Sequence, residues 1–130
     1  MCRSSRKKIE EIEARQLLAV TRSGNFSAAL KTVIRGLSHE RWLTVRDAAQ
    51  LASISVRSLQ RTLASEGESH SQLVDQVRKE LAGELLNEEG LSRGELATAL
   101  GYSTTTNFLR AQRRWQAQDS LDDSSEHTHP

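Results

Sequence analysis

Apolar residues recur three and four positions apart along most of the chain, the spacing that places side chains on one face of an α-helix. In residues 26–37 this face is formed by Ala29, Leu30, Val33, Ile34 and Leu37. Residues 6–20 carry Ile9, Ile12 and Leu17 on one side and form another predicted helix, whose basic start opposes the helix dipole. A Ser-Gly-Asn sequence separates the two predicted helices and indicates a break.

The longest helical pattern lies in residues 69–87. Its apolar positions are Leu73, Val74, Val77, Leu81, Leu85 and Leu86. At about 1.5 Å per residue, the predicted helix is roughly 27 Å long. Gly67 before it and Gly90 after it are typical of helix ends. We therefore expect one long amphipathic helix between two shorter segments.

Residues 44–63 and 92–115 repeat one helix-turn-helix pattern. In each copy a Ser or Thr begins a helix with an internal Ala, a short break follows, and a Ser starts an Arg-bearing helix. The Ala and the apolar residue of the break are five positions apart in both copies, Ala49 to Ile54 and Ala97 to Tyr102. Two helices that cross at roughly 90–120° over a short turn need a small residue at the crossing and an apolar plug in the turn.

The start of each repeat carries a capping-box pattern. Thr44 is followed three residues later by Asp47, and Ser92 by Glu95. A hydroxyl and a carboxylate at this spacing satisfy two backbone N–H groups reciprocally. The pattern predicts that both repeats begin a helix at the same relative position.

The composition favours an all-α protein, because only 4% of the residues are aromatic and the single Pro is the last residue. A hydrophobic content of 36% indicates small cores. We predict two helix-turn-helix subdomains joined by a long connecting helix. The predicted division is a basic N-terminal segment or linker remnant (1–24), a first helix-turn-helix unit (25–68), the connecting helix (69–87), a second helix-turn-helix unit (88–115) and an acidic disordered tail (116–130).

Charge is unevenly distributed along the chain. Residues 1–35 carry eight Lys and Arg against three acids, whereas residues 119–130 carry four acids and no base. Arg6, Lys7 and Lys8 form either a basic arm or a solvated surface cluster. Because local patches decide phosphate binding, a net charge of +1 does not exclude a nucleic-acid partner.

Several classes of function are not indicated. No stretch approaches the roughly 18 apolar residues that span a bilayer, and no secretion signal begins the chain. The one cysteine, Cys2, allows no internal disulfide and fits a reducing compartment. No nucleophile with a base partner, glycine-rich phosphate loop or metal-ligand cluster occurs, since His127 and His129 lack further ligands. We expect a cytoplasmic protein that is not an enzyme and holds no cofactor and no metal.

Four blocks occur in a specific order: SVRSLQR at 55–61, Val77-Arg78 through Ala82 with Leu85-Leu86 in the connecting helix, LATALGYS at 96–103 and FLRAQRRW at 108–115. On these blocks, residues 40–115 resemble the C-terminal DNA-binding domain of the AraC/XylS family of bacterial transcription regulators. The resemblance implies two helix-turn-helix units on a rigid connecting helix, with which a monomer reads two successive major-groove segments of an asymmetric site.

The chain departs from the family pattern in four respects. Ala52-Ser53 replaces Leu-Gly in the first turn, with a loss of core volume and of an easy positive-φ position. Gln112 stands where an aromatic residue packs, and an unpaired buried amide costs about 1–3 kcal/mol. After Trp115 the family's capping sequence is replaced by Gln-Ala-Gln-Asp. Residues 1–35 cannot contain the large effector domain that most members carry, so we expect no small-molecule effector domain.

The candidate base contacts lie on the second helix of each repeat. In the first repeat they are Arg57, Gln60 and Arg61, at i, i+3 and i+4 on one face opposite Leu59 and Leu63. In the second repeat they are Thr104, Thr105, Asn107 and Arg110, with Phe108 in the core. Arg binds guanine and Gln binds adenine bidentately, and Thr methyl groups suit thymine.

The candidate phosphate contacts are the backbone N–H groups near Thr44 and Ser92 and the side chains of Arg46, Arg93, Arg113 and Arg114. For each Arg the alternative is a solvated surface charge. We expect Trp42, Tyr102 and Trp115 to seal small cores rather than to stack on bases.

Together these features predict a sequence-specific regulator of transcription that binds double-stranded DNA as a monomer and is associated with the nucleoid. RNA polymerase is a second expected partner if the protein activates transcription, although the sequence identifies no surface for it. Two alternatives remain open. The chain could be a protein-interaction module or a truncated regulator that keeps the fold without useful DNA affinity, its acidic tail occupying the basic face. It could also be a non-functional fragment whose second unit does not fold.

Overall fold

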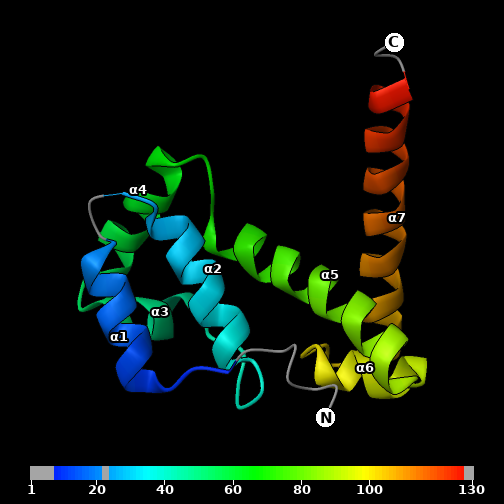
Figure 1. Cartoon of the computed structure of the whole chain (residues 1–130), viewed down its shortest axis with the longest axis horizontal. Helices are drawn as coiled ribbons and strands as arrows, with labels where there is room; N and C mark the ends of the chain where they lie inside the picture. The colour runs from blue at the N-terminus through cyan, green and yellow to red at the C-terminus, as the bar shows by residue number, and fades with distance from the viewer. Residues whose placement is uncertain (1–7, 22–23, 128–130) are drawn as a thin grey trace. The chain divides into compact units, whose positions relative to one another are not determined.

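The computed structural model describes residues 8–21 and 24–127, and their side chains except those of 88–89 and 120–127 (Figure 1). This part of the chain is helical and contains no strand. The helices are α1 (Glu11–Val20), α2 (Phe26–Leu37), α3 (Val45–Ala52), α4 (Val56–Ser65), α5 (His70–Glu89), α6 (Arg93–Ala99) and α7 (Thr105–His127). The all-α prediction is confirmed.

The chain divides into two compact units, Met1–Arg78 and Lys79–Pro130. The first unit holds α1 to α4 and the first half of α5, and the second holds the rest of α5 with α6 and α7. Each unit therefore contains one copy of the helix-turn-helix repeat. The sequence-based division treated residues 69–87 as a separate connecting helix, whereas the boundary between the two units falls within α5.

The core of the first unit is built on α2, whose apolar face is buried along its whole length. Phe26, Leu30, Val33 and Ile34 are fully buried, and α1 packs Ala14 and Leu18 into the same core. The bounds of α2 agree with the helix predicted for residues 26–37. The apolar residues spaced three and four positions apart in the sequence are thus the residues that α2 buries in the core.

The N-terminal helix begins later than the sequence suggested, at Glu11 instead of Arg6. The first turn of α1 contains the acidic residues Glu11 and Glu13. The backbone N–H of Glu10 donates to Oε1 of Glu13 at 2.9 Å. Acids stabilise the positive end of the helix dipole and bases oppose it, which accounts for the later start. Arg6 and Lys7 lie outside the described residues, and Lys8 is exposed.

A carboxylate distant in sequence caps the start of α2. Asn25, directly before the helix, has a left-handed backbone and makes no capping hydrogen bond with its side chain. Instead, the backbone N–H groups of Phe26 and Ser27 donate to the two carboxylate oxygens of Glu66 at 3.2 and 2.7 Å. Glu66 directly follows α4, so these hydrogen bonds join the end of α4 to the start of α2.

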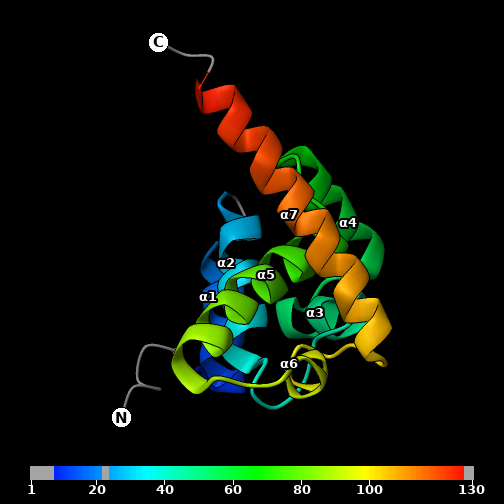
Figure 2. The same ribbon diagram turned by 90° about the vertical axis from the view of Figure 1, so that its right-hand side faces the viewer.

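Residues 116–127, predicted to belong to a disordered tail, are helical, and for these residues the prediction is wrong. Figures 1 and 2 show α7 as one long helix that continues to His127. The reason is local, since neither Gly nor Pro occurs between Gly101 and the final Pro130, and Gln and Ala favour helix. Nζ of Lys79 on α5 also pairs with the Asp119 carboxylate at 2.6 Å.

Candidate nucleic-acid interface

The first repeat begins with the capping box that the sequence predicted. The backbone N–H of Asp47 donates to Oγ1 of Thr44, and the backbone N–H of Thr44 donates to Oδ2 of Asp47, both at 3.1 Å. The hydrogen bond from the Thr44 backbone lowers the pKa of Asp47 below its ordinary value. The prediction for the start of α3 is confirmed.

The turn between α3 and α4 is closed by backbone hydrogen bonds. The N–H of Ile54 donates to the carbonyl of Ala49 at 3.0 Å, and the N–H of Ser53 donates to that of Gln50 at 3.1 Å. Ser53 has φ +59°, in the left-handed region that favours glycine. Backbone hydrogen bonds therefore hold Ile54, the apolar residue of the turn. Ser53 stands where the family pattern has Gly, so a non-glycine residue occupies a strained backbone conformation.

Helix α4 presents a polar face outward and an apolar face inward. Ser55 caps it by accepting from the backbone N–H of Ser58 at 3.0 Å. Leu59 and Leu63 are fully buried. The three candidate base contacts of this helix, Arg57, Gln60 and Arg61, are all exposed. Buried leucines thus hold the helix in place while two guanidinium groups and one amide face solvent.

A groove of about 570 Å³ lies beside α4 in the first unit. Thr44 and Gln60, two of the predicted contact residues, both line it, together with His70 at the start of α5. Nε2 of His70 is buried and has no hydrogen-bond partner among the described residues. Burial lowers the pKa of His70, partly offset by the Asp47 charge, so its neutral form is favoured. Sequence reasoning missed His70 because no spacing marks it.

The second repeat has the same start and the same turn. The backbone N–H of Ser92 donates to Oε1 of Glu95 at 2.9 Å, and that of Glu95 donates to Oγ of Ser92 at 3.2 Å. The hydrogen bond from the Ser92 backbone lowers the pKa of Glu95. In the turn, the N–H of Tyr102 donates to the carbonyl of Ala97 at 2.9 Å. Here the left-handed position is a glycine, Gly101, with φ +85°.

At the start of α7, one predicted base contact, Thr104, caps the helix, and another, Asn107, is engaged in a side-chain hydrogen bond. Oγ1 of Thr104 accepts from the backbone N–H of Asn107 at 3.1 Å, and the Asn107 amide donates to Oγ of Ser103 at 3.2 Å. The Thr104 hydroxyl hydrogen and the Asn107 carbonyl still have capacity for a further partner. The remaining candidates of this helix, Thr105 and Arg110, are exposed. This helix therefore offers fewer uncommitted polar groups than α4.

An aromatic cluster supports α7 from inside. The rings of Tyr102 and Phe108 have centroids 6.0 Å apart, and those of Phe108 and Trp115 are 6.3 Å apart in an edge-to-face arrangement. Phe108 is fully buried, Trp115 is nearly so and Tyr102 is half-buried. These rings pack within the second unit, as expected for residues that seal a small core. Gln112, expected to be a buried unpaired amide, is only half-buried.

The candidate phosphate contacts are also at the surface. Arg46 follows the capped start of α3 and Arg93 that of α6, while Arg113 and Arg114 lie on α7; all four side chains are exposed. Trp42 is half-buried, and the Arg78 guanidinium lies 5.1 Å from the centroid of its ring. That contact assigns Trp42 a packing role within the first unit.

The described part of the chain bears on two other kinds of site. It contains no group of three His, Cys, Asp or Glu residues arranged to hold a metal ion. Within the same residues, no helix is both long enough and apolar enough to cross a membrane. The side chain of His127 and the whole of His129 and Cys2 lie outside the described residues.

Comparison with known proteins places this geometry in a family. Residues 48–118 match the helix-turn-helix domain family. The chain is 30% identical over 115 residues to the HTH-type transcriptional regulator VqsM of Pseudomonas aeruginosa, and the match covers 80% of this chain and 35% of VqsM. It is 41% identical over 71 residues to the ornithine utilization regulator of the same species, which covers 55% of this chain and 21% of that protein.

The crystal structure of the transcriptional regulator CdpR from Pseudomonas aeruginosa is similar over 84% of this chain and 34% of CdpR, with a TM-score of 0.68 and 28% sequence identity. The chain therefore belongs to the helix-turn-helix regulators of the AraC/XylS type. It spans about a third of VqsM and CdpR and about a fifth of the ornithine utilization regulator.

Proposed function

We propose that this protein binds double-stranded DNA sequence-specifically and regulates transcription, with α4 and the first turns of α7 as its recognition helices. The observation that carries the proposal is the repeated geometry. Each unit has a capping box, a turn closed by a hydrogen bond five residues back, and a second helix whose polar face is exposed. Membership of a family of transcription regulators supports the same function.

The chemistry of α4 suits direct readout of base edges. Arg57 and Arg61 can each form two hydrogen bonds to O6 and N7 of guanine, and Gln60 can do so with adenine. Their helix is held by leucines that are fully buried, so the three side chains project from a fixed backbone. We propose that α4 contributes most of the base discrimination.

The start of α7 is proposed to read its segment through fewer groups. Arg110 and Thr105 are exposed, whereas Thr104 already caps the helix and the Asn107 amide already donates to Ser103. Arg46, Arg93, Arg113 and Arg114 would contact phosphates, together with the backbone N–H groups at the starts of α3 and α6. In this proposal one copy reads two major-groove segments about one helical turn apart.

Selection from a randomised duplex pool tests the proposal. The full chain is incubated with the pool at several salt concentrations, and the bound fraction is sequenced. We expect an enriched asymmetric motif with two blocks roughly 10 base pairs apart, the stronger block belonging to α4. Weak salt-dependent binding without enrichment would instead identify a fold that has lost its reading function and would favour a protein partner.

A further inference from the structure

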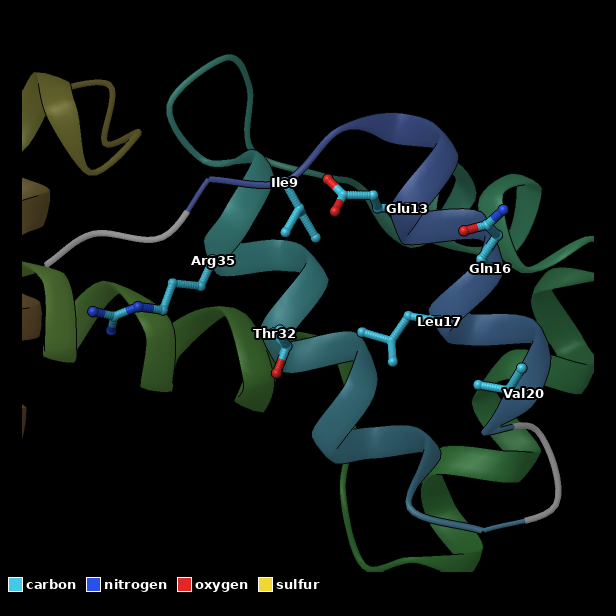
Figure 3. Close-up of a pocket in the computed structure, with 7 residues that line it drawn as sticks. All are labelled: Ile9, Glu13, Gln16, Leu17, Val20, Thr32 and Arg35. Carbon is cyan, nitrogen blue, oxygen red and sulfur yellow. The ribbon is translucent and has the colours of Figure 1, made fainter. Parts of the chain in front are cut away.

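The segment in front of α1, residues 8–10, is seated on α2. The backbone N–H of Ile9 donates to the Gly36 carbonyl at 3.3 Å. Gly36 is buried, and a Cβ in its place would collide with Cγ1 and Cδ1 of Ile9. Figure 3 shows Ile9 and Leu17 directed into the space between α1 and α2. The Ile9 side chain therefore occupies a notch that a glycine leaves open, and this notch fixes the start of α1 on α2.

Helix α1 also reaches the turn between α3 and α4. It packs against α3, and Nη1 of Arg15 donates to the Gln50 carbonyl, near the end of that helix, at 3.4 Å. Nη2 of Arg15 pairs with the Glu11 carboxylate at 3.0 Å, which holds the guanidinium against α1. The Gln50 carbonyl also accepts from the N–H of Ser53, whose backbone is left-handed. One carbonyl of the turn is thus bonded both within the turn and to α1.

Helix α2 is attached to the opposite end of α4. The N–H groups of Phe26 and Ser27 donate to the Glu66 carboxylate at 3.2 and 2.7 Å. The backbone N–H of Glu66 in turn donates to the Leu63 carbonyl at 3.0 Å. The Glu66 backbone therefore closes the last turn of α4 while its carboxylate caps the first turn of α2. A single residue joins the end of one helix to the start of the other.

These two attachments lie at the two ends of α4. The buried Leu59 and Leu63 decide which side of α4 faces inward. Apolar burial is non-directional, so it leaves a helix able to slide along its axis. Hydrogen bonds are directional, and those at the turn and at Glu66 restrict this movement. Binding side chains must be held within about 0.5 Å of their productive positions, so a small displacement of α4 would alter its base contacts.

We propose that α1 and α2 position α4 for base readout, with Arg15 acting on the α3–α4 turn and Glu66 on the end of α4. The inference rests on the proposed function, because it concerns the same recognition helix. Arg15 and Glu66 are positioning residues, which act through the backbone and not by touching DNA. Both α1 and α2 precede residue 48, where the match to the helix-turn-helix family begins. The proposal therefore gives a role in readout to helices outside the matched domain.

Base preference tests the position of α4, because a partly unfolded chain loses affinity for every duplex by the same factor. Binding of the full chain is measured with the selected duplex and with its single-base variants. Glu66→Ala should lower discrimination about fivefold, the lower limit for one bidentate base contact, in the block whose preference Arg61→Ala relaxes. Discrimination in the other block should stay at the parent value. Glu68→Ala is the matched control, since that carboxylate accepts from the Gln76 side chain and not from α2.

Gly36→Ala tests the attachment of α1 without altering α3 or α4. The added methyl group would collide with Ile9, displace the start of α1 and loosen Arg15 from the turn. Gly36→Ala and Arg15→Ala should each lower discrimination in the α4 block, and the double variant should be no worse than either, because both act through one contact. Gly83→Ala is the matched control, since nothing lies within 4 Å of a Cβ at that helix position. It should leave both blocks unchanged.

Amide hydrogen exchange of the free chain tests the same inference without DNA. In Glu66→Ala and Gly36→Ala the amides of α4 should exchange about fivefold faster relative to those of α3, as expected for the loss of one hydrogen bond. A contact that only stabilises the unit would speed exchange in both helices alike.

Two results would overturn the inference. One is unchanged exchange of α4 relative to α3, and the other is equal loss of discrimination, or none, in both blocks of the duplex. If the parent chain selects no motif, the proposed function fails, and hydrogen exchange alone decides whether α1 and α2 hold α4.

Discussion

Ile54 and Ala49 are joined by a backbone hydrogen bond of 3.0 Å, from the N–H of Ile54 to the carbonyl of Ala49. Tyr102 and Ala97 are joined in the same way at 2.9 Å. With the left-handed residue that precedes each donor, this is the arrangement of a Schellman motif at a helix C-terminus. The five-residue spacing repeated in the sequence is thus the span of one hydrogen bond that closes each turn.

The left-handed residue of the first turn is predicted to be a site of stored strain. A non-glycine residue at φ +59° costs about 1–2 kcal/mol, and glycine removes this cost at the expense of about 0.5–1 kcal/mol of chain entropy. Ser53→Gly should therefore raise the free energy of unfolding by about 0.5–1 kcal/mol. Urea denaturation followed by circular dichroism measures the change.

The second turn supplies the reciprocal control. Gly101 has φ +85°, so Gly101→Ser should lower the free energy of unfolding by about 1 kcal/mol. The two substitutions exchange the same two residue types at equivalent positions. A decrease in stability for Ser53→Gly would mean that the serine contributes a contact that outweighs its backbone strain.

Glu66 is predicted to stabilise the first unit through its two hydrogen bonds to the start of α2. Glu66→Gln removes the negative charge at the helix N-terminus and should cost about 1 kcal/mol at neutral pH. The hydrogen bonds to Ser27, followed by that to Phe26, lower the pKa of Glu66 in the folded protein below its ordinary 4.5. Its contribution is therefore present above pH 4.5 and is lost as the pH falls through the lower folded-state value.

Stability measured as a function of pH distinguishes this role from a general loss of charge. The difference between the parent chain and Glu66→Gln should be constant near neutrality and shrink below pH 4.5. Glu68→Gln is the control, because the Glu68 carboxylate accepts from the Gln76 side chain at 3.4 Å instead of from a helix start. Equal effects of the two substitutions at all pH values would argue against the capping role.

The repeats were predictable from the sequence because their determinants are local. The capping boxes of Thr44 and Ser92 and the spacing from Ala49 to Ile54 each involve residues within five positions of one another. The buried faces of α2 and α4 followed from helical periodicity, as Leu59 and Leu63 illustrate. The helix-turn-helix fold itself was within reach of such local rules.

Contacts between distant residues were not predictable in this way. Glu66 caps α2 from 40 positions away in sequence, and no spacing rule connects it with Phe26. Lys79 and Asp119 are likewise 40 positions apart, and Asp119 lies beyond residue 115, where the last helix was expected to end. The burial of His70 depends on tertiary packing. The assignment of base and phosphate contacts to particular residues stays a prediction.

Arg61 and Arg46 are predicted to contribute differently to DNA binding. Arg61 lies on the exposed face of α4, so Arg61→Ala should cost about 1–3 kcal/mol and relax the preference at one base position. Arg46 lies in the first turn of α3, so Arg46→Ala should weaken binding to all sequences and reduce the salt slope by about one. Binding to the selected duplex and to single-base variants, at several salt concentrations, separates the two results. A uniform loss for Arg61→Ala would make it a phosphate contact.

Thr104 is predicted to act first as a helix cap and only second as a DNA contact. Thr104→Ala removes the acceptor for the Asn107 backbone N–H and should lower the stability of the second unit by about 1 kcal/mol. Thr104→Ser keeps the hydroxyl and should keep that stability, while removing the methyl group that would contact thymine. Thr105→Ala, at an exposed neighbouring position without a capping hydrogen bond, should leave the melt unchanged. DNA binding to the selected duplex separates the two roles. If Thr104→Ser binds as the parent chain does while Thr105→Ala and Arg110→Ala bind more weakly, then Thr105 and Arg110 carry the readout by α7. Any weaker DNA binding of Thr104→Ala then follows from a frayed helix start.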